Sequence, residues 1–265
     1  MSEQAALLLQ NPDAVPTQIN GMIEIGYPGR FVRAMKKKMH IHGQVTVVNY
    51  AESATDIIQC GFPRPYDRFV PMNDYAPWDT ETFQENSVDL VTCFIGLHHI
   101  PEDKLDGFLG SIRRALRPGG SFLLVDHNVQ DEKTKDYANL AHSVYNAVMG
   151  VSIEEEMGEV RNFKSLADWV AILEKAGFSV EMESHTPSVR DGDPTKNSMI
   201  RFVKKPELPA RLTADTDETV DVALSSRQQP PVIQQFESDH SKANARLPAG
   251  QTHISSSTPR LVQTA

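Results

Sequence analysis

From residue 22 to residue 204, short apolar runs alternate with stretches whose apolar residues recur three and four positions apart. The short runs predict strands, and the spaced pattern predicts amphipathic helices. The run VDLVTCFI at 88–95 is nearly continuous, as expected of a strand that is buried on both faces. Strands are predicted at 22–25, 44–48, 68–72, 88–95, 121–126, 178–183 and 198–204, and helices at 30–40, 54–59, 102–116, 131–151 and 165–176.

This alternation of strands and helices predicts the fold class. Strands that are linked by helices are joined by right-handed crossovers and lie parallel, with the helices packed on the sheet. Only a loop separates the last two predicted strands, so a final strand is expected to run antiparallel. The sequence therefore predicts an α/β fold with a doubly wound, mostly parallel, seven-stranded sheet.

A long helical stretch interrupts the alternation after the strand at 121–126. Its apolar residues are Tyr137, Leu140, Ala141, Val144, Tyr145 and Val148. We expect this stretch to form a cap over the carboxyl edge of the sheet, where open parallel sheets bind their ligands. The predicted organisation is an N-terminal extension at 1–20 and one domain at 21–205, with a helical cap or substrate insertion at 131–164 inside that domain.

The composition changes near Pro206. The segment 206–265 is rich in Ser, Thr, Gln, Pro and Asp, and its apolar residues are scattered. Such a segment buries too little apolar surface to offset the entropy of ordering it, which predicts a disordered tail. A short motif between Pro230 and Phe236 that binds a protein partner is the alternative.

The charge balance excludes several classes of function. The chain has 26 Lys and Arg residues against 35 Asp and Glu residues, a formal net charge of -9, so we expect no nucleic-acid partner. No run reaches the roughly 18 apolar residues that a membrane span needs. The N-terminus lacks the pattern of a signal peptide. These features predict a soluble, cytoplasmic protein without a membrane partner.

The most specific pattern begins at the strand 88–95. It continues with GLHHI at 96–100, an amphipathic helix, LRPGG at 116–120 and FLLVD at 122–126. In this order and spacing it resembles the class I S-adenosylmethionine-dependent methyltransferases, in particular methyltransferase type 11-like domains, over residues 20–204. The resemblance implies a Rossmann-like sheet and S-adenosyl-L-methionine as the cofactor. It also implies transfer of a methyl group to an oxygen, nitrogen or carbon atom of a small-molecule nucleophile.

The resemblance assigns cofactor contacts to the loops that follow the first four strands. The loop EIGYPGR would line the methionine and ribose side of the cofactor. The position after the second strand would hold the ribose hydroxyls, and the position after the third would contact the adenine amino group. The residues that the resemblance places around the cofactor are Glu24, Gly26, Gly29, Asn49, Asn73, Asp74, Phe94 and Gly96.

The first of these loops departs from the family pattern, in which three glycines alternate with other residues after an acidic residue. The sequence here is Gly26-Tyr27-Pro28-Gly29, so the central glycine is missing and Pro28 lacks a backbone donor. We favour a subfamily with its own loop that still binds the cofactor. The alternative is a non-catalytic methyltransferase-like module that binds a partner. A dinucleotide-dependent oxidoreductase is disfavoured, because the loop lacks the G-x-G-x-x-G spacing.

Two histidines and one carboxylate are the candidate catalytic groups. His98 or His99 is a candidate general base, since imidazole titrates near neutral pH, and Asp126 can orient a substrate or a histidine. In the structural alternative, the histidines shape the pocket through backbone hydrogen bonds and Asp126 caps the next segment. No metal site is expected, because adjacent side chains rarely share an ion and no third or fourth ligand has suitable spacing.

Four further residues are candidates for contact with the substrate. His127 follows Asp126, and His142 and Tyr145 are three positions apart on the predicted cap helix, where they would share a face. Arg161 lies in a polar loop before the last helix and can hold a carboxylate through paired hydrogen bonds. Packing of Tyr145 and a surface salt bridge of Arg161 are the structural alternatives.

Overall fold

The computed structural model describes residues 18–26, 29, 31–37, 39–52, 66–186 and 192–205. The helix predicted at 54–59, most of the N-terminal extension and the tail at 206–265 lie outside these ranges. Tyr27 and Pro28 of the first loop also lie outside them. Within the described ranges, every helix is too short or too polar to cross a membrane.

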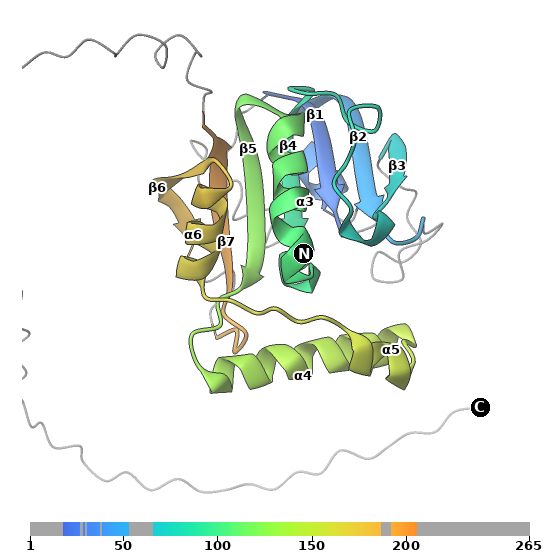
Figure 1. Ribbon diagram of the computed structural model, residues 1–265, viewed down its shortest axis with the longest axis vertical. Coiled ribbons are helices and arrows are strands. Elements are labelled where there is room, and N and C mark those ends of the chain that lie inside the picture. Colours follow the sequence, from blue (N-terminus) through green and yellow to red (C-terminus); the bar gives the residue numbers. More distant parts are fainter. Residues whose placement is uncertain are drawn as a thin grey trace, which may run out of the picture. The chain divides into compact units, whose positions relative to one another are not determined.

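Seven strands of the described chain form one mixed sheet (Figure 1). They are β1 (Gln18–Ile25), β2 (His40–Asn49), β3 (Arg68–Pro71), β4 (Val88–Phe94), β5 (Leu116–His127), β6 (Phe178–Thr186) and β7 (Asn197–Lys204). Their order across the sheet is β3-β2-β1-β4-β5-β7-β6. Strand β7 runs antiparallel to both of its neighbours, and the other pairs are parallel. The predicted α/β fold with an antiparallel final strand is confirmed.

Helices and short 3-10 turns connect these strands. They are α2 (Val32–Lys36), η2 (Asn73–Tyr75), η3 (Leu97–His99), α3 (Glu102–Ala115), α4 (Glu132–Met149), α5 (Ile153–Gly158) and α6 (Leu166–Lys175). The helix predicted at 30–40 is shorter than expected, because β2 already begins at His40. The apolar pattern does not predict α5. That helix buries no residue and begins instead with a capping box between Ser152 and Glu155.

Two apolar clusters pack on the sheet, because successive side chains of a strand point to opposite faces. Ile23 and Ile25 of β1 join the larger cluster together with α3 and α6, whereas Met22 joins the smaller cluster with α2. The apolar face predicted for the helix at 102–116 is buried in the larger cluster and consists of Leu105, Phe108, Leu109, Ile112 and Leu116. Contacts on both faces account for the nearly continuous apolar run of β4.

The LRPGG motif belongs to a strand, although the sequence pattern predicts only a break before one. Helix α3 ends at Ala115 as expected, but β5 begins at once, and its pairing with β4 shifts register between Val88 and Leu90. A Cβ atom on Gly120 would lie 2.8 Å from the carbonyl oxygen of Arg117. Close approach of the backbone to itself therefore requires a glycine at this position.

The long helix α4 lies across the carboxyl end of the sheet, as expected of the predicted cap (Figure 1). Its buried residues repeat every four positions and are Thr134, Ala138, His142 and Asn146. The apolar residues on which the cap prediction depends lie on the exposed side instead: Leu140, Val144 and Val148 are 59%, 55% and 78% exposed. A mostly polar stripe thus covers the edge of the sheet.

Two Leu→Ala substitutions on helices test where the core lies. Leu173 of α6 is fully buried, and Leu140 of α4 is 59% exposed. We expect Leu173→Ala to lower the free energy of unfolding by about 2–5 kcal/mol, because it removes buried methyl groups and leaves a cavity. The matched variant Leu140→Ala should change it by less than about 0.5 kcal/mol. Urea unfolding followed by circular dichroism measures both, and equal effects would contradict this assignment of the core.

Candidate active site

The carboxyl edge between β1 and β4 is the switch point of the sheet. Strand β1 lies between β2 and β4, with Glu24 in register with Val47 on one side and Thr92 on the other. From β1 the chain continues toward β2 on one side of this point, and from β4 it continues toward β5 on the other. Open α/β sheets bind their ligands in the crevice that such a reversal creates.

The first loop borders this edge. Glu24 is buried, and its Oε1 accepts a hydrogen bond of 3.4 Å from the backbone N–H of Phe31 at the start of α2. Gly26 has a φ of 86° and donates its N–H to the carbonyl oxygen of Val48 at 2.9 Å. Among the residues that the structure describes, and apart from the chain neighbours of Gly26, no atom lies within 4 Å of the place where a Cβ of Gly26 would be. Gly29 also has a positive φ, of 78°. The described part of the loop is therefore left-handed at both glycines and leaves space beside Gly26.

The segments after β2 and β3 bring further predicted contacts to the same edge. Asn49 ends β2, and its Oδ1 accepts a hydrogen bond of 2.8 Å from the N–H of Tyr50. Asn73, Asp74 and Tyr75 follow β3 with φ values of 49°, 51° and 58°. Left-handed backbone at successive non-glycine residues costs free energy, and strain of this kind clusters at functional sites.

Two of the predicted cofactor residues also have partners within the protein. The carboxylate of Asp74 forms an ion pair with Lys104 of α3. Phe94 is 1% exposed and packs edge-to-face on Phe31, with 4.8 Å between the ring centroids. Its ring therefore belongs to the smaller core cluster. Gly96 is half-buried and leads directly into η3.

A buried imidazole and a buried carboxylate meet where β4 and β5 end. The Nδ1 of His98 in η3 lies 2.6 Å from the Oδ1 of Asp126 in β5, and the two side chains are 0% and 2% exposed. Asp126 also accepts hydrogen bonds from the backbone N–H of His127 at 2.7 Å and from that of His98 at 3.3 Å. The carboxylate thus holds both the ring and the backbone of the GLHHI loop.

Two further imidazoles meet His98 beneath the cap. The Nε2 of His142 in α4 lies 3.1 Å from the Nε2 of His98 and 3.1 Å from the Nε2 of His127. The ring of Phe163 packs against these three rings, with its centroid 4.8 Å from that of His98. The sheet edge, the cap helix and the segment after the cap therefore meet in one histidine cluster, which we define as His98, His99, His127 and His142.

His99 lies at the rim of the histidine cluster, and its side chain is 21% exposed. Its Nδ1 lies 3.1 Å from the carbonyl oxygen of Val160 and 3.4 Å from Oε1 of Glu159. Its ring centroid is 5.0 Å from that of His142. Both histidines of the GLHHI loop therefore face the cap.

Burial determines the protonation of three of the histidines in this cluster, because a charged imidazole would lose its hydration there. It lowers the pKa of His98 well below the usual range, lowers the pKa of His127 to about 4 and lowers the pKa of His142 to about 2. Burial also raises the pKa of Asp126 to about 6, although the backbone hydrogen bonds that its carboxylate accepts from His127 and His98 act to lower this pKa. At neutral pH the rings of His98, His127 and His142 are therefore uncharged, so each of these three presents one ring nitrogen with a free lone pair.

Arg161 is engaged within the cap. Its guanidinium lies 2.7 Å from Oε1 of Glu156 and 2.6 Å from Oε2 of Glu159. Glu156 also accepts hydrogen bonds of 2.5 Å from Ser143 and from Asn146. This network joins α4, α5 and the loop that follows them. The structure therefore shows the salt bridge that was the alternative for Arg161, and contact of Arg161 with a substrate stays a prediction.

Tyr145 is less buried than His142. The two residues are three positions apart on one continuous helix, so they lie on neighbouring positions of the same face. His142 belongs to the buried stripe of α4, whereas Tyr145 is 43% exposed. Contact of Tyr145 with a substrate stays a prediction.

Asn162 is a site residue that the sequence patterns do not reveal. Its backbone N–H donates to the carbonyl oxygen of His98 at 2.7 Å, and its side-chain amide donates to that of Ile100 at 2.9 Å. The segment after the cap thus fixes the backbone of the GLHHI loop. The only signal in the sequence is a polar residue beside an aromatic one, Asn162-Phe163, between two predicted helices. That signal is too common to identify a site.

The sequence argument against a metal site depends on the lack of a third ligand near His98 and His99. The structure supplies one, because α4 brings His142 from a distant part of the chain. One ligand atom from each of these three residues lies within 4.8 Å of the other two. That premise of the argument is therefore wrong.

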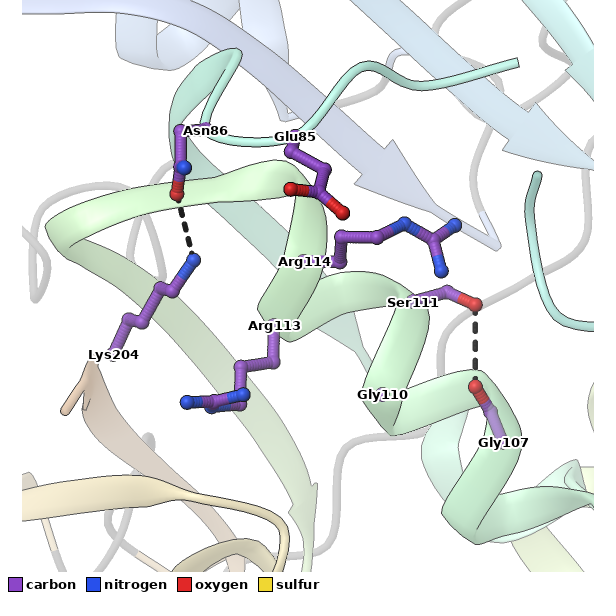
Figure 2. Close-up of a pocket in the computed structure, with 8 residues that line it drawn as sticks. All are labelled: Glu85, Asn86, Gly107, Gly110, Ser111, Arg113, Arg114 and Lys204. Atoms are coloured by element: carbon purple, nitrogen blue, oxygen red, sulfur yellow. Dashed lines mark hydrogen bonds between the residues drawn. The ribbon is translucent and has the colours of Figure 1, made fainter. Parts of the chain in front are cut away.

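A cavity of about 380 Å³ lies at the opposite edge of the sheet (Figure 2). Its lining residues are Glu85, Asn86, Gly107, Gly110, Ser111, Arg113, Arg114 and Lys204. Lys204 ends β7 and donates to Oδ1 of Asn86, which lies just before β4. The cavity thus borders the start of β4, away from the loops that follow β1 and β4, and we place the candidate active site at the histidine cluster.

A family model described as a methyltransferase domain matches residues 22–183, more than half of the chain. The chain belongs to the methyltransferase-domain family. The match begins in β1 and ends in β6, so it includes the loops at the switch point, the cap and the histidine cluster. The cofactor of these methyltransferase domains is S-adenosyl-L-methionine. Among curated proteins, none matches this methyltransferase domain.

Solved structures share the fold at low sequence identity. A chain of the complex that contains the Haloferax volcanii Trm112 methyltransferase activator is 15% identical, with a TM-score of 0.54 over 77% of this chain and 90% of that chain. The CurJ carbon methyltransferase is 12% identical, with a TM-score of 0.52 over 77% and 54%. An S-adenosylmethionine-dependent methyltransferase from Mesorhizobium loti is 15% identical, with a TM-score of 0.50 over 77% and 98%. At these identities the similarity shows the fold alone.

The described residues at the switch point fit a sulfonium cofactor. The open space beside Gly26 allows a ligand to approach the backbone. The buried side chain of Glu24 places a carboxyl group at the end of β1, where it can offset a positive charge. Asn49 brings a half-buried amide, which can both donate and accept hydrogen bonds, to the end of β2.

The network around Glu156 predicts a pH dependence of stability. Hydrogen bonds from Ser143, Asn146 and Arg161 lower the pKa of Glu156 from the ordinary value of 4.5 to about 2. A group whose pKa is lowered by folding stabilises the protein fully above its unfolded pKa, and it loses this effect as the pH falls toward the folded pKa. Glu156→Gln should therefore lower the melting temperature by a few degrees at pH 6, and the difference from the unmodified chain should shrink as the pH falls toward 3.

Glu154→Gln is the matched control, since Glu154 is an exposed glutamate of the same helix. Differential scanning calorimetry between pH 3 and pH 7 measures all three proteins. A difference for Glu156→Gln that stays constant over this range, or one that Glu154→Gln reproduces, would show that Glu156 is not coupled to folding in this way.

Proposed function

We propose that this methyltransferase domain transfers a methyl group from S-adenosyl-L-methionine to a small-molecule nucleophile held at the histidine cluster. The observation that carries the proposal is the Asp126–His98 pair, which is buried beside the switch point at the ends of β4 and β5. When bound, the cofactor supplies a methyl group on an already activated sulfonium. The residues of the chain therefore have to align the nucleophile, exclude water and receive or release its proton.

The Asp126–His98 contact supports a defined role for each residue. An ionised carboxylate only accepts hydrogen bonds, so the proton of the His98 ring lies on Nδ1. The lone pair of Nε2 then faces His142 and the space beneath α4. In the proposed reaction this Nε2 interacts with a hydroxyl or amine of the nucleophile, and Asp126 is the positioning residue that orients the ring.

The cap supports a small molecule as the methyl acceptor. Helix α4 lies over the edge, and the network of Arg161 with Glu156 and Glu159 ties the segment after α5 back to α4. A covered edge admits a small molecule more readily than a folded macromolecule. The net charge of -9 also disfavours a nucleic-acid substrate. His127, His142 and His99 are then the residues that line the acceptor side.

Cofactor binding is the first test. Calorimetric titration of the full chain with S-adenosyl-L-methionine and with its demethylated product should show micromolar binding of both. Gly26→Ala should weaken that binding about tenfold or more, since the added methyl group enters the space that a cofactor approaches. The matched control is Gly119→Ala, because Gly119 also has a positive φ, of 76°, and open space around it, but lies at the start of β5.

Both substitutions place a Cβ on left-handed backbone, so each costs about 1–2 kcal/mol of stability. Only the change at Gly26 should alter the affinity for the cofactor. If the folded full chain binds neither compound at millimolar concentration, the proposed enzyme activity is wrong and a partner-binding module replaces it.

The role of Asp126 is tested by turnover. A panel of small hydroxyl and amine compounds is screened with the full chain, and formation of the demethylated cofactor is measured. With the best acceptor, Asp126→Asn should reduce kcat by about 10²–10⁴-fold, because the His98 ring loses the charge that orients it. Its cofactor affinity should change by less than about threefold, which also reports that the variant is folded.

Asp131→Asn is the control for this substitution. Asp131 caps α4 by accepting a hydrogen bond from the N–H of Thr134, and Asn is an equally good capping residue. Its kcat should match that of the unmodified chain. A full kcat in the Asp126→Asn variant would contradict the assignment of the acceptor side to the histidine cluster.

A further inference from the structure

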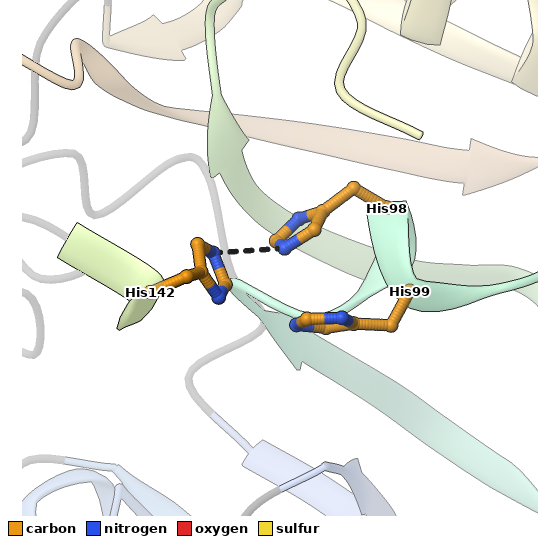
Figure 3. A group of neighbouring side chains, drawn as sticks. All are labelled: His98, His99 and His142. Carbon is orange, nitrogen blue, oxygen red and sulfur yellow. Dashed lines mark hydrogen bonds between the residues drawn. The ribbon is translucent and has the colours of Figure 1, made fainter. Parts of the chain in front are cut away.

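Three imidazoles from two separate elements gather around one space. His98 and His99 come from η3 and His142 comes from α4, and one ligand atom of each lies within 4.8 Å of the other two. Figure 3 shows the three rings pointing toward one another. Cap and sheet edge thus converge on a set of nitrogen atoms, the type of ligand that suits zinc, copper and nickel ions.

The hydrogen bonds of two of these rings direct their lone pairs inward. His98 donates from Nδ1 to the Asp126 carboxylate at 2.6 Å, so its Nε2 carries the lone pair. The Nδ1 of His99 faces the carbonyl oxygen of Val160 at 3.1 Å, and because a carbonyl oxygen only accepts, this Nδ1 carries a proton, which leaves Nε2 as the atom available to a metal ion. A second ring nitrogen that donates to a carboxylate or to a backbone carbonyl is the usual arrangement of metal-binding histidines.

The separation between the rings of His98 and His142 is close to that of two nitrogen ligands on one zinc ion. The Nε2 atoms of His98 and His142 are 3.1 Å apart. Two nitrogen atoms at about 2.0–2.1 Å from one tetrahedral zinc ion lie about 3.3 Å apart. His142 Nε2 also lies 3.1 Å from His127 Nε2, and it carries at most one proton to share between these two contacts. A metal ion that is bound by the lone pairs of these rings removes the need for His142 to share one proton between two contacts.

We propose that His98, His99 and His142 bind one divalent metal ion that prefers nitrogen ligands, such as zinc, and that the fourth coordination position of this ion is open. Three protein ligands and one open position are typical of zinc sites that act on a substrate, whereas structural sites are closed by four. His99, whose side chain is 21% exposed, gives the ion a path from solvent. Asp126 and the carbonyl group of Val160 act as the outer partners that orient the ligands.

This inference rests on the proposed function where it concerns the acceptor, and it narrows the acceptor's chemistry. An open position on the metal ion takes an oxygen or nitrogen atom, so the acceptor should carry a hydroxyl, carboxylate or amine group at the methylated end. In this arrangement the lone pair of His98 binds the ion, and the nucleophile is held by the ion instead of by the ring. A bare carbon nucleophile is then disfavoured.

The test uses the full chain, with any purification tag removed and metals stripped by a chelator. Zinc binding is measured by calorimetry, and Co²⁺ binding by the visible absorption that distinguishes four-coordinate from six-coordinate cobalt. We expect one ion per chain with micromolar or tighter affinity, and a four-coordinate cobalt spectrum. His142→Ala and His99→Ala should each weaken zinc binding by more than the roughly 10–100-fold expected for loss of an outer partner such as Asp126.

His42→Ala is the matched control. His42 is exposed on β2, and its ring stacks on that of His40 with 6.2 Å between the centroids. Weak binding of zinc to the protein surface would therefore occur at this pair. Zinc binding that is lost in His42→Ala and kept in the other two variants would overturn the inference, as would six-coordinate cobalt or the absence of binding. Since His99 is partly exposed, His99→Ala tests the site without opening a cavity in the core.

Titration of the same proteins with S-adenosyl-L-methionine separates the two proposals. Cofactor binding without zinc binding would overturn the metal site and leave the proposed methyl transfer intact. Zinc binding that depends on His99 and His142, without cofactor binding, would support the site and contradict the proposed function.

Discussion

The hydrogen bond between Asp126 and His98 is the constraint on which the candidate site depends. It joins the end of β5 to the loop after β4, and it is shielded from solvent, with the two side chains 0% and 2% exposed. Loss of either partner would leave a buried polar group without its hydrogen bond, which is far more costly than the loss of an exposed contact. The same bond determines which nitrogen of His98 carries the proton. That choice leaves the lone pair on the other ring nitrogen of His98. It thereby determines where this lone pair points and how the rings of His142 in α4 and His127 in β5 approach it.

The cap follows from the same constraint. An amphipathic helix ordinarily turns its apolar face to the protein, but α4 turns a stripe of Thr134, Ala138, His142 and Asn146 toward the sheet edge and leaves Leu140, Val144 and Val148 exposed. Conflicts between local pattern and global structure are expected at functional sites. Leaving these apolar residues of α4 exposed forgoes the stabilisation that their burial would give. The network that holds α5 and Arg161 against α4 offsets this loss in part.

Most of the fold could be predicted from the sequence, because burial on both faces of β4 and the spacing of α3 leave a direct apolar pattern. The positions of Glu24, Gly26, Asn49 and Asp74 at one edge follow from the parallel sheet that the pattern predicts. The contact between His142 and His98 could not be predicted. It depends on which face α4 turns toward the sheet edge, and the apolar residues of α4 suggest the wrong face. The role of Asn162 was equally out of reach, because its partners His98 and Ile100 are distant in the chain and no local pattern specifies them.

The insertion of β7 between β5 and β6 affects how the protein is made. The last described strand pairs with β5 from Ser121 to His127 and with β6 from Phe178 onward, so it fills a gap between two strands that precede it in the chain. During synthesis the sheet cannot close until Lys204 has left the ribosome. Before that point, β5 presents an open edge whose N–H and C=O groups can pair with another nascent chain. Any truncation that removes β7 would make that open edge permanent, and the histidine cluster would then lie on a sheet prone to aggregation.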